Sequence, residues 1–167
     1  MDEIAANFRF DPTSLSLFRI ATNNIDPKDV YTIQTRYKDS SEDFKTVGHI
    51  KYLDIPYWIA QKIRVAKLLT LDSCMQKSIL DIGTGPGYFG SVCKALGHSF
   101  IGTDIYVPMY DDICRLLGVD RRVAPTRLHK PLETFGEQFD LTTIMWQTFH
   151  VKGVLAGGLV GLGMHEV

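Results

Sequence analysis

A glycine-rich turn stands between a short apolar run and a segment with helical periodicity. The run Ser78 to Ile82 leads into Gly83-Thr84-Gly85-Pro86-Gly87, and apolar side chains then recur at helical spacing until Gly97. Glycine has no Cβ, so a ligand can approach such a turn closely, and the N-terminus of the following helix offers unpaired N–H groups. The pattern is typical of a nucleotide-binding turn between a strand and a helix.

Two aspartates accompany this turn. Asp81 lies two residues before Gly83, and Asp104 ends the next apolar run, Ser99 to Asp104. A carboxylate at the end of that second strand can accept hydrogen bonds from a ribose. The negative charge of Asp81 disfavours a pyrophosphate and favours a cationic amino group. A nucleoside that carries an amino-acid tail satisfies both conditions.

The spacing of the glycines separates this turn from the dinucleotide-binding fingerprint. In GxGxxG the third glycine would fall at Tyr88, whereas here it comes one residue earlier, at Gly87. A nicotinamide-nucleotide-binding domain therefore stays open only as an alternative.

The run Asp81 to Gly87, with Asp104 closing Ile101-Gly102-Thr103-Asp104, resembles the cofactor signature of the class I S-adenosylmethionine-dependent methyltransferases. The resemblance covers about residues 54–150. It implies that Asp104 binds the ribose hydroxyls and that Ile105 lies beside the adenine. The residues that it assigns to the methionine part of S-adenosylmethionine belong to the first strand and the turn: Asp81, Gly83, Thr84, Gly85 and Gly87.

The segment Phe139 to Trp146 resembles the fourth strand of the same family, whose end lines the methyl-transfer pocket. This places Met145 and Trp146 in a candidate substrate pocket. If the acceptor of the methyl group is a hydroxyl, His150 is the candidate general base. The reaction implied is an in-line displacement at the sulfonium methyl of a small-molecule methyltransferase. A purely structural role stays open for each of these side chains. Met145 and Trp146 could instead belong to the hydrophobic core, and His150 could lie on the surface or at the edge of the core.

The elements needed to position these residues alternate along the chain. Apolar runs predict four strands, and helical spacing predicts the helices between the first three. The expected fold is α/β, a Rossmann-like parallel sheet of the class I methyltransferase type with helices on both faces. The predicted strands are Ser78 to Ile82, Ser99 to Asp104, Arg122 to Leu128 and Phe139 to Trp146. The predicted helices cover 55–70, the stretch from Gly87 to Gly97, and the stretch from Pro108 to Gly118.

Three parts of the chain follow from this pattern: an N-terminal cover segment at 1–53, a cofactor-binding α/β domain at 54–152 and a Gly-rich tail at 153–167. The pairs Asp11-Pro12, Asn23-Asn24 and Asp26-Pro27 interrupt the cover segment, which is therefore expected to hold loops and short elements, among them a short strand at 31–37. About twenty residues follow Trp146, so the sheet is expected to be incomplete after the fourth strand. This favours a second hypothesis, a truncated methyltransferase-like protein that binds the cofactor without catalysis.

Composition limits the partners and the location of the protein. The chain of 167 residues has 18 Lys and Arg against 19 Asp and Glu, which disfavours nucleic acid and favours a small-molecule substrate. The three cysteines predict no metal site, and no membrane span or signal is expected, so we place the protein in the cytoplasm. An exposed fourth-strand edge could mediate oligomer formation. Two groups of basic residues are interpreted as solvated: Lys62, Arg64 and Lys67, and the run Arg121, Arg122, Arg127, His129 and Lys130.

Overall fold

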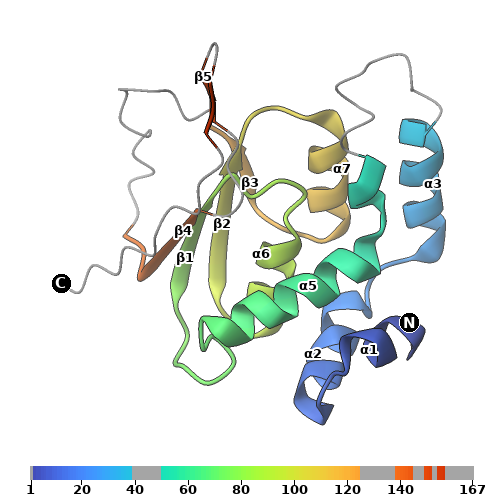
Figure 1. Ribbon diagram of the computed structural model, residues 1–167, viewed down its shortest axis with the longest axis vertical. Coiled ribbons are helices and arrows are strands. Elements are labelled where there is room, and N and C mark those ends of the chain that lie inside the picture. Colours follow the sequence, from blue (N-terminus) through green and yellow to red (C-terminus); the bar gives the residue numbers. More distant parts are fainter. Residues whose placement is uncertain (1, 39–49, 125–137, 145–148, 152–153, 157–167) are drawn as a thin grey trace.

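A computed structural model describes residues 2–38, 50–124, 138–144, 149–151 and 154–156. Its centre is an all-parallel sheet in the order β3-β2-β1-β4 (Figure 1). The strands are β1 (Ser78–Ile82), β2 (Ser99–Asp104), β3 (Arg121–Val123) and β4 (Leu141–Ile144). The register places Asp81 of β1 opposite Gly102 of β2 and Thr143 of β4. With its helices this sheet is an α/β fold of the Rossmann-like kind, as the sequence predicts.

Three helices pack on one face of the sheet (Figure 1). They are α5 (Ile55–Leu68), α6 (Tyr88–Ala95) and α7 (Pro108–Leu116). Asp54 caps α5 by accepting a hydrogen bond from the backbone N–H of Tyr57, and Ile59 and Ile63 of this helix are fully buried in the core. These helices agree with the expected α/β fold on this face, and helices on the opposite face stay a prediction.

The N-terminal prediction was wrong. This part of the chain forms three helices, α1 (Asp2–Phe8), α2 (Pro12–Thr22) and α3 (Pro27–Lys38), followed by the short 3-10 helix η1 (Ile50–Leu53). Asp11 caps α2 by accepting a hydrogen bond from the N–H of Ser14 (2.7 Å), so the Asp-Pro pair begins a helix instead of interrupting one. The predicted strand at 31–37 is helical because Val30, Ile33 and Tyr37 pack on the core at helical spacing.

Helix α3 is fastened to α7 through one carboxylate. Asp112 accepts a hydrogen bond from the hydroxyl of Tyr37 (2.8 Å) and forms an ion pair with Arg36. Arg115 also pairs with Asp112, at 2.9 Å. The N-terminal helices therefore belong to the same packed unit as the sheet-covering helices.

The later strands differ in length from the prediction. β3 covers only Arg121–Val123 of the expected Arg122 to Leu128, and β4 covers Leu141–Ile144 of the expected Phe139 to Trp146. Residues 125–137 and 145–148 lie outside the described residues. A separate antiparallel pair is formed by β5 (Phe149–Val151) and β6 (Val154–Ala156), so part of the predicted Gly-rich tail is a strand.

Hydrogen bonds with the side chains of His98 and Asp140 join the segments that lead into the strands at the amino end of the sheet. The Nδ1 atom of His98 accepts a hydrogen bond from the N–H of Lys77 (3.1 Å), and its Nε2 lies 2.9 Å from the carbonyl oxygen of Leu71. Asp140 accepts hydrogen bonds from the N–H and the hydroxyl of Ser78 (2.6 and 2.8 Å), which lower the pKa of its carboxyl. These contacts join the starts of β1, β2 and β4.

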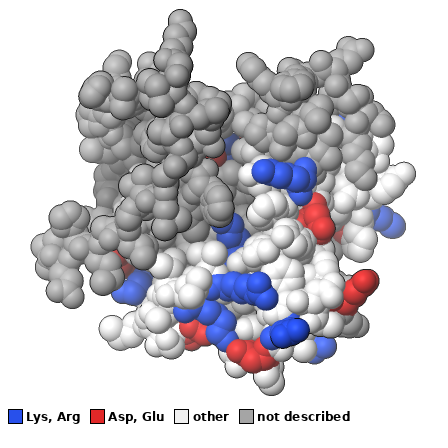
Figure 2. Space-filling view, viewed as in Figure 1, with Lys and Arg blue, Asp and Glu red and all other residues white. Residues whose placement is uncertain are grey.

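Basic and acidic side chains are interspersed on the described part of the surface in view (Figure 2). Ion pairs join some of the described basic and acidic side chains, as between Lys67 and Asp11 (2.6 Å). No helix within the described ranges is both long and apolar enough to cross a membrane.

Candidate functional site

The glycine-rich turn joins the carboxyl end of β1 to α6 and is anchored on β2. The backbone N–H groups of Gly83 and Thr84 donate to the carbonyl oxygen of Thr103 (2.7 and 3.1 Å). Thr84 also lies against Gly102, where a Cβ would come within 2.5 Å of the Thr84 side chain. A glycine in β2 thus makes room for the turn, a contact that was not predicted from the sequence.

Two glycines of the turn have different reasons to be glycine. Both have positive φ, +57° at Gly85 and +78° at Gly87, a conformation that L side chains rarely adopt. A Cβ on Gly87 would lie 2.7 Å from the Sγ atom of Cys114, whereas a Cβ on Gly85 would have no atom of the described residues within 4 Å. Packing therefore requires Gly87, while the backbone at Gly85 faces open space that a ligand can enter.

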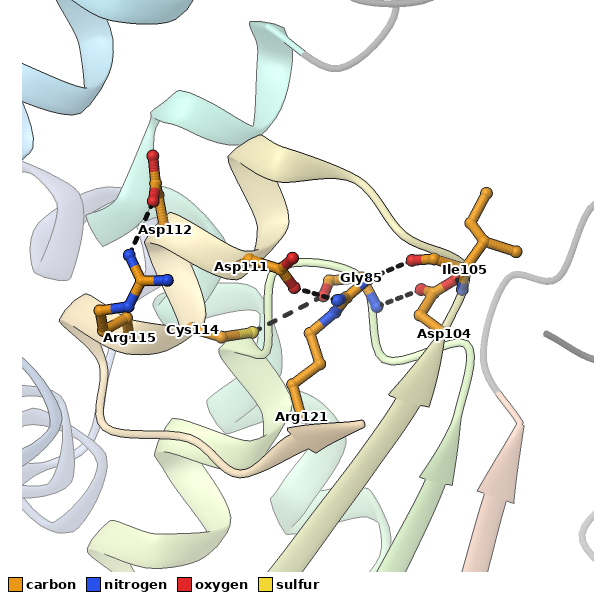
Figure 3. Close-up of polar contacts among 8 residues, drawn as sticks. All are labelled: Gly85, Asp104, Ile105, Asp111, Asp112, Cys114, Arg115 and Arg121. Atoms are coloured by element: carbon orange, nitrogen blue, oxygen red, sulfur yellow. Dashed lines mark hydrogen bonds and ion pairs between the residues drawn. The ribbon is translucent and has the colours of Figure 1, made fainter. Parts of the chain in front are cut away.

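The structure brings the predicted ribose-binding carboxylate to this turn. Asp104 Oδ2 accepts a hydrogen bond from the N–H of Gly85 (2.7 Å), and Asp104 Oδ1 accepts one from the N–H of Ile105 (2.7 Å), as Figure 3 shows. A carboxylate oxygen can accept more than one hydrogen bond, so both oxygens keep capacity for a ligand. Ile105 and Tyr106 follow with 55% and 66% of their surfaces exposed.

Asp81 lies beneath the turn. Its residue surface is only 2% exposed, and its Oδ1 accepts a hydrogen bond from the hydroxyl of Thr143 (2.8 Å). Burial raises the pKa of the carboxyl to about 6, against the opposing effects of Thr143 and of the positive charge of Lys62. Asp81 was predicted to contact an amino group of the cofactor. In the structure its carboxylate already accepts the hydrogen bond from Thr143 and lies within the influence of the Lys62 charge.

Lys62 was predicted to face mostly water, whereas in the structure this residue is half-buried. Burial lowers the pKa of its amine, and the charge of Asp81 partly offsets this effect. A signal was present in the sequence, because Lys62 continues the buried positions Ile55, Ile59 and Ala66 at spacings of four, three and four residues. A lysine at such a position of an amphipathic helix is a candidate partner for a buried acid.

Arg121 was interpreted as part of a solvated basic run, and the structure corrects this. Its side chain is 2% exposed and reaches under the turn between β2 and α7, where it pairs with Asp111 and donates to the carbonyl oxygen of Ile105 (Figure 3). Its guanidinium carbon lies 5.9 Å from the centre of the Tyr110 ring. No pattern in the sequence indicates these contacts, because they join β3 to residues ten and sixteen positions earlier.

The structure does not describe the side chains of the remaining predicted site residues. Met145 and Trp146 lie outside the described residues, and His150 lies in β5, without a described side chain. Within the part of the chain that the structure describes, no group of three or more His, Cys, Asp or Glu residues is placed to hold a metal ion. Cys93 and Cys114 are buried thiols.

No protein-family model, curated protein or solved structure matches this chain. The functional argument therefore depends on the geometry of the glycine-rich turn and on the residues around Asp104.

Proposed function

We propose that this protein is an S-adenosylmethionine-dependent methyltransferase that acts on a small molecule. The observation that carries the proposal is the hydrogen bond between the N–H of Gly85 and the carboxylate of Asp104. It joins the turn after β1 to the end of β2, at the carboxyl edge of the sheet where ligands bind in open α/β folds. A nucleoside with an amino-acid tail needs both parts at once.

The chain offers suitable groups for each part of that cofactor. The open backbone at Gly85 suits the approach of the methionine part, and the spare lone pairs of Asp104 suit the ribose hydroxyls. The exposed side chain of Ile105 suits the face of the adenine. When bound, S-adenosylmethionine supplies a sulfonium methyl group for transfer, and the residues of the turn orient it. His150 as base, and Met145 and Trp146 as pocket, belong to the same proposal.

A second candidate function is cofactor binding without methyl transfer. Within the described residues the sheet ends at β4, which pairs only with β1. A methyl-transfer pocket in this fold needs walls beyond that strand. Clear methylation of an acceptor by the 167-residue chain would exclude this candidate.

A nicotinamide-nucleotide domain is less well supported. Tyr88 stands where the dinucleotide fingerprint needs its third glycine, is 2% exposed, and donates a hydrogen bond from its hydroxyl to the carbonyl oxygen of Tyr52. We expect fluorescence titration with NADH to show no binding.

The proposal is tested by calorimetry with S-adenosylhomocysteine. We expect the protein to bind it, and Asp104→Ala to weaken binding roughly tenfold or more, because a hydrogen bond to a charged group contributes about 1.5–3 kcal/mol. Asp72→Ala is the matched control, because within the described residues the ion pair of Asp72 with Lys67 is a loose one (3.9 Å). Absence of binding by the folded protein, or undiminished binding by Asp104→Ala, would contradict the cofactor assignment.

A further inference from the structure

The turn that carries Asp104 has little apolar packing of its own. Ile105 and Tyr106 are 55% and 66% exposed, so burial of their side chains does not fix the backbone between β2 and α7. Polar contacts must therefore hold the turn. Within the described residues, the buried side chain that reaches it from below is Arg121.

The contacts of Arg121 continue directly into the candidate ribose site. Arg121 donates to the carbonyl oxygen of Ile105, the N–H of Ile105 donates to Asp104 Oδ1, and the N–H of Gly85 donates to Asp104 Oδ2. The chain of hydrogen bonds thus runs from β3 through the β2 turn to the glycine-rich turn (Figure 3). Because Arg121 fixes the residue whose N–H binds Asp104, it restricts the orientation of that carboxylate.

The chemistry of arginine suits this position. One terminal nitrogen pairs with Asp111 of α7 while the other reaches the Ile105 carbonyl, so the planar guanidinium spans two elements at a fixed separation. The ion pair with Asp111 also compensates the burial of the positive charge. A lysine amine is a single point of charge and cannot reproduce both contacts with the same geometry.

We propose that Arg121 is a positioning residue that holds the Asp104 carboxylate ready for the two hydroxyls of a ribose. This inference rests on the proposed function and deepens it, because it makes recognition of the ribose depend on a side chain that does not touch the ligand. It assigns the preference for ribonucleosides over 2'-deoxyribonucleosides to the Arg121, Ile105 and Asp104 contacts together.

The test compares S-adenosylhomocysteine with its 2'-deoxyribose analogue by calorimetry. We expect the wild-type protein to prefer the ribose form roughly tenfold, as for one hydrogen bond to a charged group. Arg121→Met should weaken binding of the ribose form about tenfold and bring the ratio of the two affinities close to one. Arg115→Met is the matched control, because Arg115 is 77% exposed and pairs with Asp112 without touching the turn. Both affinities should be unchanged in that control.

Amide NMR gives a readout that needs no ligand. The Gly85 and Ile105 N–H signals should move in Arg121→Met and stay in place in Arg115→Met, because both N–H groups donate to Asp104. Arg121→Lys serves if Arg121→Met does not fold, and should reduce the ribose preference while keeping the charge.

Several outcomes would overturn the inference. An unchanged ribose preference with unmoved amide signals, or an equal loss of affinity for both ligands with the preference intact, would leave Arg121 a purely structural residue. Failure of the wild-type protein to bind either ligand would instead remove the proposed function, and the inference with it.

Discussion

The two ends of the parallel sheet differ. At the amino end, polar side chains form hydrogen bonds between the segments that lead into the strands. At the carboxyl end, the backbone of the glycine-rich turn and exposed apolar side chains lie near the buried guanidinium of Arg121. His98 binds both Leu71 and Lys77 at the amino end. At the carboxyl end Gly85 faces open space and Ile105 is 55% exposed. The difference indicates where this fold gains stability and where it keeps room for a ligand.

The largest effect is expected from His98→Ala, at the amino end. The substitution leaves the N–H of Lys77 and the carbonyl oxygen of Leu71 without their partner and opens a small cavity. We expect urea unfolding to show a loss of about 4 kcal/mol, with S-adenosylhomocysteine affinity unchanged. His98→Asn keeps one donor and one acceptor and should lose less. A large loss of affinity for S-adenosylhomocysteine in a folded His98→Ala protein would contradict the separation of stability at the amino end from ligand binding at the carboxyl end.

Within the carboxyl end, Gly87→Ala and Gly85→Ala separate packing from ligand access. Gly87→Ala should cost about 3 kcal/mol in unfolding free energy, because left-handed strain adds to the clash with Cys114. Gly85→Ala should cost only about 1 kcal/mol, since its Cβ enters open space, but should abolish binding of S-adenosylhomocysteine. Equal losses of stability, or unaltered binding by Gly85→Ala, would contradict this description.

The aspartates at the two ends should respond to pH with opposite signs. Burial raises the pKa of Asp81 from 3.8 to about 6, so the stability that it contributes is present below about pH 4 and lost as the pH rises through 6. Relative to wild type, Asp81→Asn should therefore gain up to about 3 kcal/mol between pH 4 and 7, as a shift of two pKa units implies.

Asp140→Asn is the counterpart at the amino end. Hydrogen bonds from Ser78 lower the pKa of Asp140, so its contribution is present above the ordinary carboxyl pKa and lost as the pH falls. Urea unfolding from pH 3 to 8 measures both differences. If the difference in unfolding free energy from wild type changed with pH in the same direction for both variants, the opposite pKa shifts of the two carboxyl groups would be contradicted.

The smallest effect is expected where α5 leads into the amino end. Thr70 has φ +56°, an unfavourable conformation for a β-branched residue, and the N–H of Leu71 beside it donates to the carbonyl oxygen of Ala66 (2.9 Å). Thr70→Gly should stabilise the protein by about 0.5–1 kcal/mol and raise Tm by a few degrees. Thr70→Ala keeps the Cβ and should not give this gain. A fall in Tm for Thr70→Gly would show that the strain is compensated.

The sequence predicted the sheet better than the helices before it. β1 and β2 were predicted to the residue, because each is a short apolar run with a turn residue or a charged residue at its ends. The N-terminal helices were missed because Asp11-Pro12 was interpreted as a loop, although aspartate caps a helix and proline suits its first turn. An Asp-Pro pair suits a loop as well as the start of a helix, and here the packing of Leu17 and Phe18 of α2 on the core favours the helix.

The same contrast holds within the candidate site. The proximity of Gly85 and Asp104 could be predicted, because Gly85 lies in the turn after β1, Asp104 ends β2, and parallel strands bring their carboxyl ends together. Arg121 could not, since its contacts depend on how β3 and α7 pack. Lys62 lies between these cases: its spacing along α5 indicates burial, but only the tertiary fold brings its charge near Asp81.

Consecutive residues of α7 serve two distant parts of the molecule. Asp112 is bound by Arg36 and Tyr37 of the N-terminal helices, and Asp111 is bound by Arg121 beneath the turn. A fragment starting at Asp54 would lose the contacts of Arg36 and Tyr37 with Asp112, and we expect this loss to weaken the support that Asp111 and Arg121 give to the turn between β2 and α7. Helix α3 therefore holds α7 in place for a contact on the opposite side of that helix, although it makes no contact with Arg121 among the described hydrogen bonds and ion pairs.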